Sequence, residues 1–140
     1  MMAGATVCMQ AEKQYTLQKI HEKIHYIEGA EQVSKTEYNI NGVTIWILVY
    51  EKYYLRTGGY ASLTVTLTEY QQAQTACIVS SGGGNGIVNH SFGSNRNLAK
   101  ACVEVLETCG FSVTKSDLDP SGKGFAERFL NEILSRNDIS

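Results

Sequence analysis

Residues 38–68 decide the fold; they read YNINGVTIWILVYEKYYLRTGGYASLTVTLT. Two turn signals divide this stretch. Asn41-Gly42, between β-branched residues, is the strongest short-range signal of a β-hairpin. Gly58-Gly59 is a second signal of the same kind. Residues 43–56, between the turns, are rich in β-branched and aromatic side chains, and residues 63–68 alternate as a half-buried strand does. The stretch therefore predicts consecutive antiparallel strands.

A two-residue turn at Gly58-Gly59 pairs Tyr50 with Leu67 and Arg56 with Ala61. Because side chains alternate along a strand, this register gives the sheet two faces of different character. One face, which we expect helices to cover, carries Trp46, Leu48, Tyr50, Tyr54, Leu63, Val65 and Leu67. The other carries Tyr38, Ile40, Ile45, Ile47 and Val49 beside Thr64, Thr66 and Thr68.

Outward from this stretch, residues 75–81 predict a fourth strand, and three segments predict helices. Residues 14–28 place Leu17, Ile20, Ile24 and Ile27 at helical spacing. A second helix is expected over residues 94–109, with Ser94 as its N-cap, and a third over residues 121–136. The predicted fold is an α+β domain, a four-stranded antiparallel meander packed with about three helices, in the order helix, four strands, two helices.

Length and charge restrict the class of protein. The chain has 140 residues, 43% of them hydrophobic and 19% charged, which predicts one domain over residues 1–140 with a substantial core. A net charge of −2 argues against a nucleic-acid binder. No apolar run is long enough to cross a membrane, and the first residues lack the pattern of a signal peptide. We expect a cytoplasmic protein.

The four cysteines, at positions 8, 77, 102 and 109, include no CxxC pair. Disulfides are rare in cytosolic proteins, and free cysteine packs as a small hydrophobic residue. The sequence therefore predicts four buried, reduced, structural thiols.

One short motif suggests metal chemistry. His21-Glu22-Lys23-Ile24-His25 spells HExxH, in which two histidines on one helix face bind zinc and the glutamate activates water. The charged Lys23 departs from the pattern of zinc peptidases, and the buried stripe of the helix leaves His21 and His25 at its flank and Glu22 nearly opposite. We expect surface histidines and no cofactor, with a zinc-dependent hydrolase as the alternative.

A glycine-rich segment ahead of the second helix is a candidate site for a ligand. Helix N-termini offer free N–H groups to anions, and two cations in the first helical turns suit a bound anion. A plain connecting loop is the alternative. The candidate anion or ligand site consists of Gly83, Gly84, Asn85, Ser94, Asn95, Arg96 and Lys100.

The stretch from residue 80 to residue 111 resembles small, single-domain proteins of unknown function from anaerobic Gram-positive bacteria. The resemblance rests on the glycine-rich turn, the following residues 89–97, which read NHSFGSNRN, and the helix. It implies a small bacterial protein and brings no activity or site residues with it.

These observations predict a non-enzymatic binding module that takes a small molecule or a protein partner. The second sheet face is too apolar for an ordinary solvent face, and contiguous patches of this kind mark contact surfaces. We therefore expect a homodimer, since a twofold dimer is the commonest closed assembly. The alternative is a three-layer monomer, in which the first helix crosses to this face and covers it. Its expected interface is Tyr38, Ile40, Ile45, Ile47 and Val49.

Overall fold

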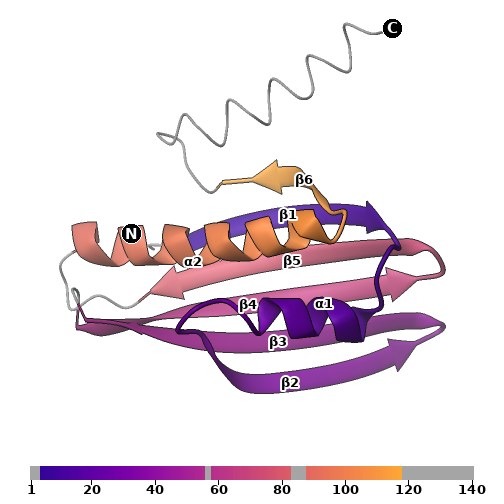
Figure 1. The fold of residues 1–140 in the computed structure, drawn as a ribbon, viewed down its shortest axis with the longest axis horizontal. Coiled ribbons are helices and arrows are strands. Elements are labelled where there is room, and N and C mark those ends of the chain that lie inside the picture. Colours follow the sequence, from indigo (N-terminus) through magenta and orange to yellow (C-terminus); the bar gives the residue numbers. More distant parts are fainter. Residues whose placement is uncertain (1–3, 56–57, 83–87, 118–140) are drawn as a thin grey trace, which may run out of the picture.

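A computed structural model describes residues 4–55, 58–82 and 88–117, with residues 88–96 described by their backbone alone. The elements in chain order are β1 (Gly4–Glu12), α1 (Leu17–Ile24), β2 (Glu31–Ile40), β3 (Val43–Tyr54), β4 (Gly59–Tyr70), β5 (Ala73–Gly82), α2 (Val88–Thr108) and β6 (Ser112–Ser116). The strands form one antiparallel sheet in the order β2-β3-β4-β5-β1-β6 (Figure 1). No helix of the described residues has the length and apolarity to cross a membrane.

The predicted fold class is wrong. The described part of the chain is mostly a six-stranded antiparallel sheet with two helices, and the wording α+β fits it poorly. A strand precedes the first helix and another follows the second, so the predicted element order also fails. These two strands bury few apolar residues: Ala5, Val7 and Met9 alternate in β1, and β6 buries Val113 alone. The predicted helix over residues 121–136 lies outside the described residues.

Helix α1 has the predicted apolar stripe but is shorter than predicted. Thr16 is its N-cap, and its hydroxyl accepts a hydrogen bond from the Lys19 N–H at 3.1 Å. Leu17, Ile20 and Ile24 are buried as expected. The α-helix ends at Ile24. The N–H of the C-cap His25 still donates to the His21 carbonyl, but the N–H groups of Tyr26 and Ile27 donate three residues back, which tightens the last turn.

Helix α2 ends near the expected residue but begins earlier than predicted. Gly110 follows its last turn with φ +91°, and the Phe111 N–H donates to the Leu106 carbonyl, which is the bond of a Schellman motif. The helix starts at Val88, so Ser94 lies inside it and is not its N-cap. The polar run at residues 89–97, interpreted as loop and cap, continues the helix instead.

The Asn41-Gly42 hairpin is confirmed. Both residues have positive φ, +51° and +83°, as a type I′ turn requires, and Ile40 pairs with Val43 across it. The second hairpin differs from the predicted register. Tyr50 pairs with Leu63 instead of Leu67, because β3 ends at Tyr54 and Gly59 already belongs to β4.

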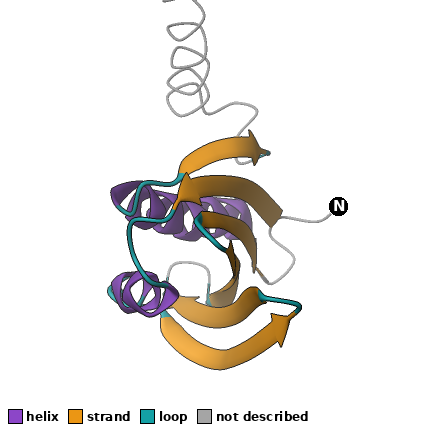
Figure 2. Ribbon diagram, turned by 90° about the vertical axis from the view of Figure 1, so that its right-hand side faces the viewer, coloured by secondary structure: helices purple, strands orange, loops and turns teal. Residues whose placement is uncertain are grey.

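That register error is four residues, an even number, so every side chain stays on its predicted face. Both helices lie on one face of the sheet (Figure 2). Leu48, Tyr50, Leu63, Val65 and Leu67 on that face are fully buried, as predicted. Trp46 and Tyr54 are half-buried against the same core. The core is completed by β1 and β5 and by the apolar sides of α1 and α2, chiefly Val7, Ile20, Ile24, Ile78, Leu98 and Leu106.

Candidate functional site

The sheet surface that faces away from the helices is uncovered in the described part of the chain (Figure 2); we call it the open face. Three central rows of paired residues cross it from β2 to β5: Tyr38–Ile45–Thr68–Thr75, Thr36–Ile47–Thr66–Cys77 and Ser34–Val49–Thr64–Val79. The pairs Ile40–Val43 and Tyr70–Ala73 extend the open face towards the hairpin turns. None of these residues is charged. With strands about 4.8 Å apart and about 3.4 Å per residue, this uncharged block covers roughly 500 Å².

All five predicted interface residues lie on the open face and are brought together there. Ile45, Ile47 and Val49 alternate along β3, are half-buried, and each pair with a threonine of β4. Tyr38 and Ile40 on the edge strand are 50% and 56% exposed. The structure therefore assembles the predicted patch, and its role as an interface remains a prediction.

Tyrosines flank this aliphatic stripe at both ends. Tyr53 and Tyr60 pair across β3 and β4, and their rings meet edge to face with centroids 5.0 Å apart. At the other end Tyr70 lies close to Gly42, on the side of the sheet that carries Tyr38. All four are about half-exposed. Exposed tyrosines around an apolar centre are typical of protein contact surfaces.

The rest of the open face is polar but uncharged near its centre. The hydroxyl groups of Thr68 and Thr75 hydrogen-bond to each other across β4 and β5. Those of Ser62 and Ser81 do the same at 2.8 Å. Since these hydroxyls satisfy one another, part of their hydrogen-bonding capacity is met before any partner arrives.

The histidine motif on α1 makes contacts inside the protein. His21 Nε2 lies 2.6 Å from Gln32 Oε1, and its ring packs edge-on against Trp46. His25 is exposed, and Glu22 forms an exposed ion pair with Lys19 at 3.6 Å. Among residues 4–55, 58–82 and 88–117, no group of three His, Cys, Asp or Glu side chains could hold a metal. The zinc alternative therefore has no third ligand in the described part.

The predicted ligand loop falls largely beyond what the structure describes. Gly83, Gly84 and Asn85 lie outside the described residues, and the side chains of Ser94, Asn95 and Arg96 are not described. Lys100 is exposed on α2. Because α2 begins at Val88, residues 94–96 belong to the interior of the helix. The predicted anion site required free N–H groups in the first helical turn, and residues 94–96 do not lie in that turn.

The cysteines divide into two pairs. Cys102, within α2, and Cys109, directly after it, are buried as predicted, and burial raises the pKa of Cys102 to about 12. Cys8 and Cys77 are only half-buried; they face each other across β1 and β5 on the open face. The sequence does not predict this second pair, because β1 lacks a clear strand signal.

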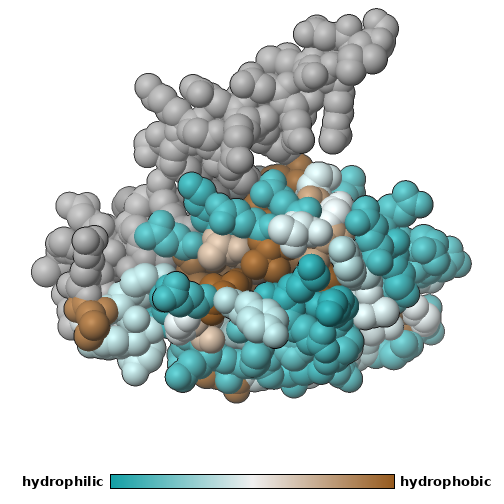
Figure 3. Space-filling model, viewed as in Figure 1, coloured by the Kyte–Doolittle hydropathy of each residue, from teal (hydrophilic) through white to brown (hydrophobic). Residues whose placement is uncertain are grey.

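On the opposite side of the molecule, a shallow hollow of about 430 Å³ separates α1 from α2. Hydrophobic surface gathers between the two helices in Figure 3. Tyr26, Ile27, Ala101 and Val105 line it together with charged residues of both helices. The mixed lining and open shape make this hollow a weaker candidate than the open face.

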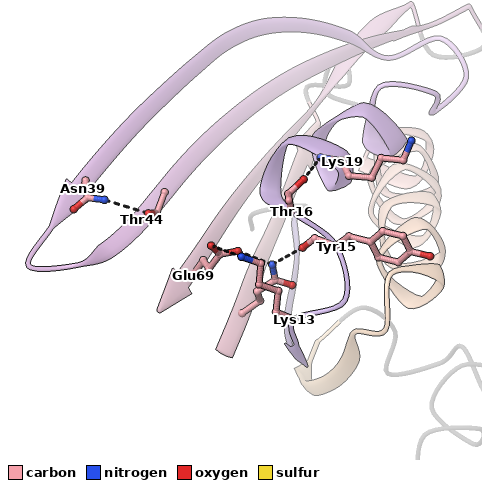
Figure 4. A network of polar contacts seen from close by, with 8 residues as sticks. Lys13, Tyr15, Thr16, Lys19, Asn39, Thr44 and Glu69 are labelled. Carbon is pink, nitrogen blue, oxygen red and sulfur yellow. Dashed lines mark hydrogen bonds and ion pairs between the residues drawn. The ribbon is translucent and has the colours of Figure 1, made fainter. Parts of the chain in front are cut away.

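A polar network fixes the sheet where β4 meets β5. The Gln74 amide is almost fully buried and donates to the Tyr15 carbonyl and to Glu69, each at 2.8 Å. Lys13 pairs with Glu69 at 3.2 Å (Figure 4). A second hollow of about 610 Å³ lies beside this network, between Tyr70 and Ser112. These contacts attach the loop before α1 to the sheet.

Two comparisons with known proteins bear on this chain. A family model described as "Family of unknown function (DUF6054)" matches residues 2–110, which is more than half of the chain. The comparison with curated proteins finds no match. The expected resemblance to a family of unknown function is thereby confirmed.

Proposed function

Because this chain belongs to the DUF6054 family of unknown function, we propose its function from its own geometry: a non-enzymatic binding module that self-associates through the open face. The observation that carries this proposal is the asymmetry of the sheet. Both helices cover one face, while the other presents a contiguous uncharged surface of aliphatic, threonine and tyrosine side chains.

The exposed apolar side chains supply the driving force. Tyr38, Ile40 and Val79 are 40–56% exposed, so covering each yields about 1 kcal/mol, roughly half of the value for full burial. The half-buried Ile45 and Ile47 add smaller amounts. Contiguous apolar patches of several hundred Å² on monomers usually mark an interaction site.

A second copy of the chain is the occupant that the surface fits best. Five long strands of ten residues give a face of about 24 by 33 Å, or about 800 Å², which is what each partner buries in a standard protein interface. The uncharged block of roughly 500 Å² creates no like-charge repulsion where it meets itself. Glu51 of β3 and Glu12 of β1 lie on the same face outside this block. Two sheets packed face to face, as in β-sandwiches, would bury both copies of the patch around a twofold axis.

The edge of the sheet is a less suitable contact than its face. Edge strand β2 carries a bulge between Gln32 and Ser34, and Lys35 on it pairs with Glu37 at 2.9 Å and lies over the Trp46 ring. Bulges and charged residues on edge strands oppose edge-to-edge pairing. Association through strand addition is therefore disfavoured at this edge.

Sedimentation equilibrium of purified protein tests the proposal. We expect a mass near twice 15.4 kDa at high micromolar concentration. Thr66→Lys, which places a charge beside Ile47 in the centre of the patch, should shift the mass towards monomer without changing the far-UV spectrum. Leu55→Glu, at an 88% exposed position outside the patch, is the matched control and should stay dimeric. Monomeric wild type, or equal effects of both variants, contradicts the proposal.

A further inference from the structure

Two thiols meet on the open face at the junction of β1 and β5. Cys8 and Cys77 are directly opposite each other in the antiparallel register, and their strand neighbours Met9 and Ala76 point into the core. Both thiols are free and half-buried. They lie in the same row as Thr66, so they belong to the surface that carries Ile47.

The register places this pair within reach of a covalent bond. Directly opposed residues of antiparallel strands have Cα atoms about 4.5–5.5 Å apart, and disulfides span about 4.4–6.8 Å. Burial, and then the neighbouring Cys8 thiol, which also hydrogen-bonds to it, raise the pKa of Cys77. The two sulfur atoms are therefore neighbours already in the reduced protein, and a bond between them needs no rearrangement of the strands.

The other two cysteines differ from this pair in exposure and serve as an internal control. Cys102 and Cys109 are buried between α2 and the sheet. Burial raises the pKa of both thiols, as it does that of Cys77, so the contrast between the two pairs rests on exposure to the oxidant. A small oxidant reaches the pair on the open face and not these two.

We propose that Cys8 and Cys77 form a redox-active dithiol, which low-molecular-weight disulfides such as oxidised glutathione convert into a cross-strand disulfide. One cysteine, as its thiolate, attacks the S–S bond of the oxidant and releases one reduced glutathione. The second cysteine then attacks the mixed disulfide and releases the other. The protein loses two protons and two electrons, and the oxidant becomes two thiols.

The bond would tie β1 to β5 and close a loop of roughly 70 residues. Cross-links that close long loops stabilise by restricting the unfolded chain. For this loop length and a protein of this size we expect the oxidised form to melt about 10 °C above the reduced form. Formation of the disulfide leaves the charge of the open face unaltered and links the row that contains Thr66 and Cys77 to β1.

Intact mass and peptide mapping after treatment with oxidised glutathione test the proposal. Wild type and Cys102→Ser, the matched control, should lose two hydrogen atoms and yield one peptide pair linked between residues 8 and 77, which dithiothreitol reverses. Cys8→Ser and Cys77→Ser should stop at the glutathione adduct. A wild type that links Cys102 or Cys109 overturns the proposal. So does a Thr66→Lys protein, whose open face stays uncovered, that stops at the adduct or does not react.

The same treatment of Thr66→Lys separates this inference from self-association. This variant keeps both thiols and an uncovered open face, so the disulfide should form in it whether or not the wild-type protein is a dimer. Failure to form it there overturns the dithiol. A monomeric wild type that forms it overturns only the proposed function.

Discussion

Ile47 and Leu48 are neighbours on β3, and truncating each to alanine should lower the free energy of unfolding by unequal amounts. Leu48 is fully buried beneath the helices, so Leu48→Ala leaves a cavity and should lower the free energy of unfolding by about 2–5 kcal/mol. Ile47 is half-buried between Thr36 and Thr66 on the open face. Its truncation in the monomer leaves no closed cavity and should lower the free energy of unfolding by about 1 kcal/mol.

Thermal unfolding at low micromolar concentration measures this difference. For a domain of this size, 1 kcal/mol shifts Tm by about 3–4 °C. Leu48→Ala should therefore lower Tm by about 10 °C, and Ile47→Ala by about 3 °C. Raising the concentration should raise Tm of the wild type and of Leu48→Ala by mass action, and Ile47→Ala should gain less. Equal losses at low concentration, or a larger loss for Ile47→Ala, would refute the assignment of the two faces.

Two further predictions concern the core and the end of α2. Burial holds the pKa of Cys102 and of Tyr50 at about 12, above their ordinary values of 9.0 and 10.0. As pH rises, the unfolded chain therefore loses these protons before the folded protein does, and the free energy of unfolding should fall above pH 9. Urea titrations should show this fall, less steeply in Cys102→Ala. An equal dependence on pH in wild type and variant would contradict the burial argument. Gly110→Ala should lower the free energy of unfolding by about 1–2 kcal/mol, because φ is +91° and the new Cβ would lie 2.8 Å from the Gln14 amide. Gly58→Ala, at φ +65° with open space around it, is the control in the same titrations, and an equal loss there would contradict the role of Gln14.

The parts of the fold that the sequence predicts correctly depend on local chemistry. Asn41-Gly42 supplies the two positive φ angles of its turn, and the period of two along β3 and β4 fixes which side chains share a face. The error at the second hairpin arose because Gly58 and Gly59 are equivalent in sequence. Only the structure shows that Gly58 closes a longer turn while Gly59 is already paired.

The missed elements lack such local signals. Strand β1 alternates in burial, but Ala5 and Val7 are small and its other face holds threonine and cysteine. It is a strand because β5 and β6 pair on either side of it. In α2 the polar residues before Arg96 resemble a cap and loop in sequence, yet they continue the helix backbone.

The candidate site likewise has a part that local sequence signals predict and a part that they do not. The expected patch on β2 and β3 follows from one hairpin, so residues such as Tyr38 and Ile45, which pair directly, could be predicted together. The contact between Cys8 and Cys77 joins the first strand of the chain to the fifth, with α1 and three strands between them in the sequence. Nothing in the sequence near either cysteine indicates its partner.

The accessibility of methyl groups to a soluble paramagnetic agent, measured by NMR, shows whether a second copy of the chain covers the open face. At high micromolar concentration, the methyl groups of Ile45 and Ile47 should be shielded nearly as well as those of the core residue Leu48. In Thr66→Lys at the same concentration, they should relax as exposed groups while Leu48 stays shielded. If Ile45 and Ile47 relax equally in wild type and variant, the open face is not covered by a second copy and the account fails.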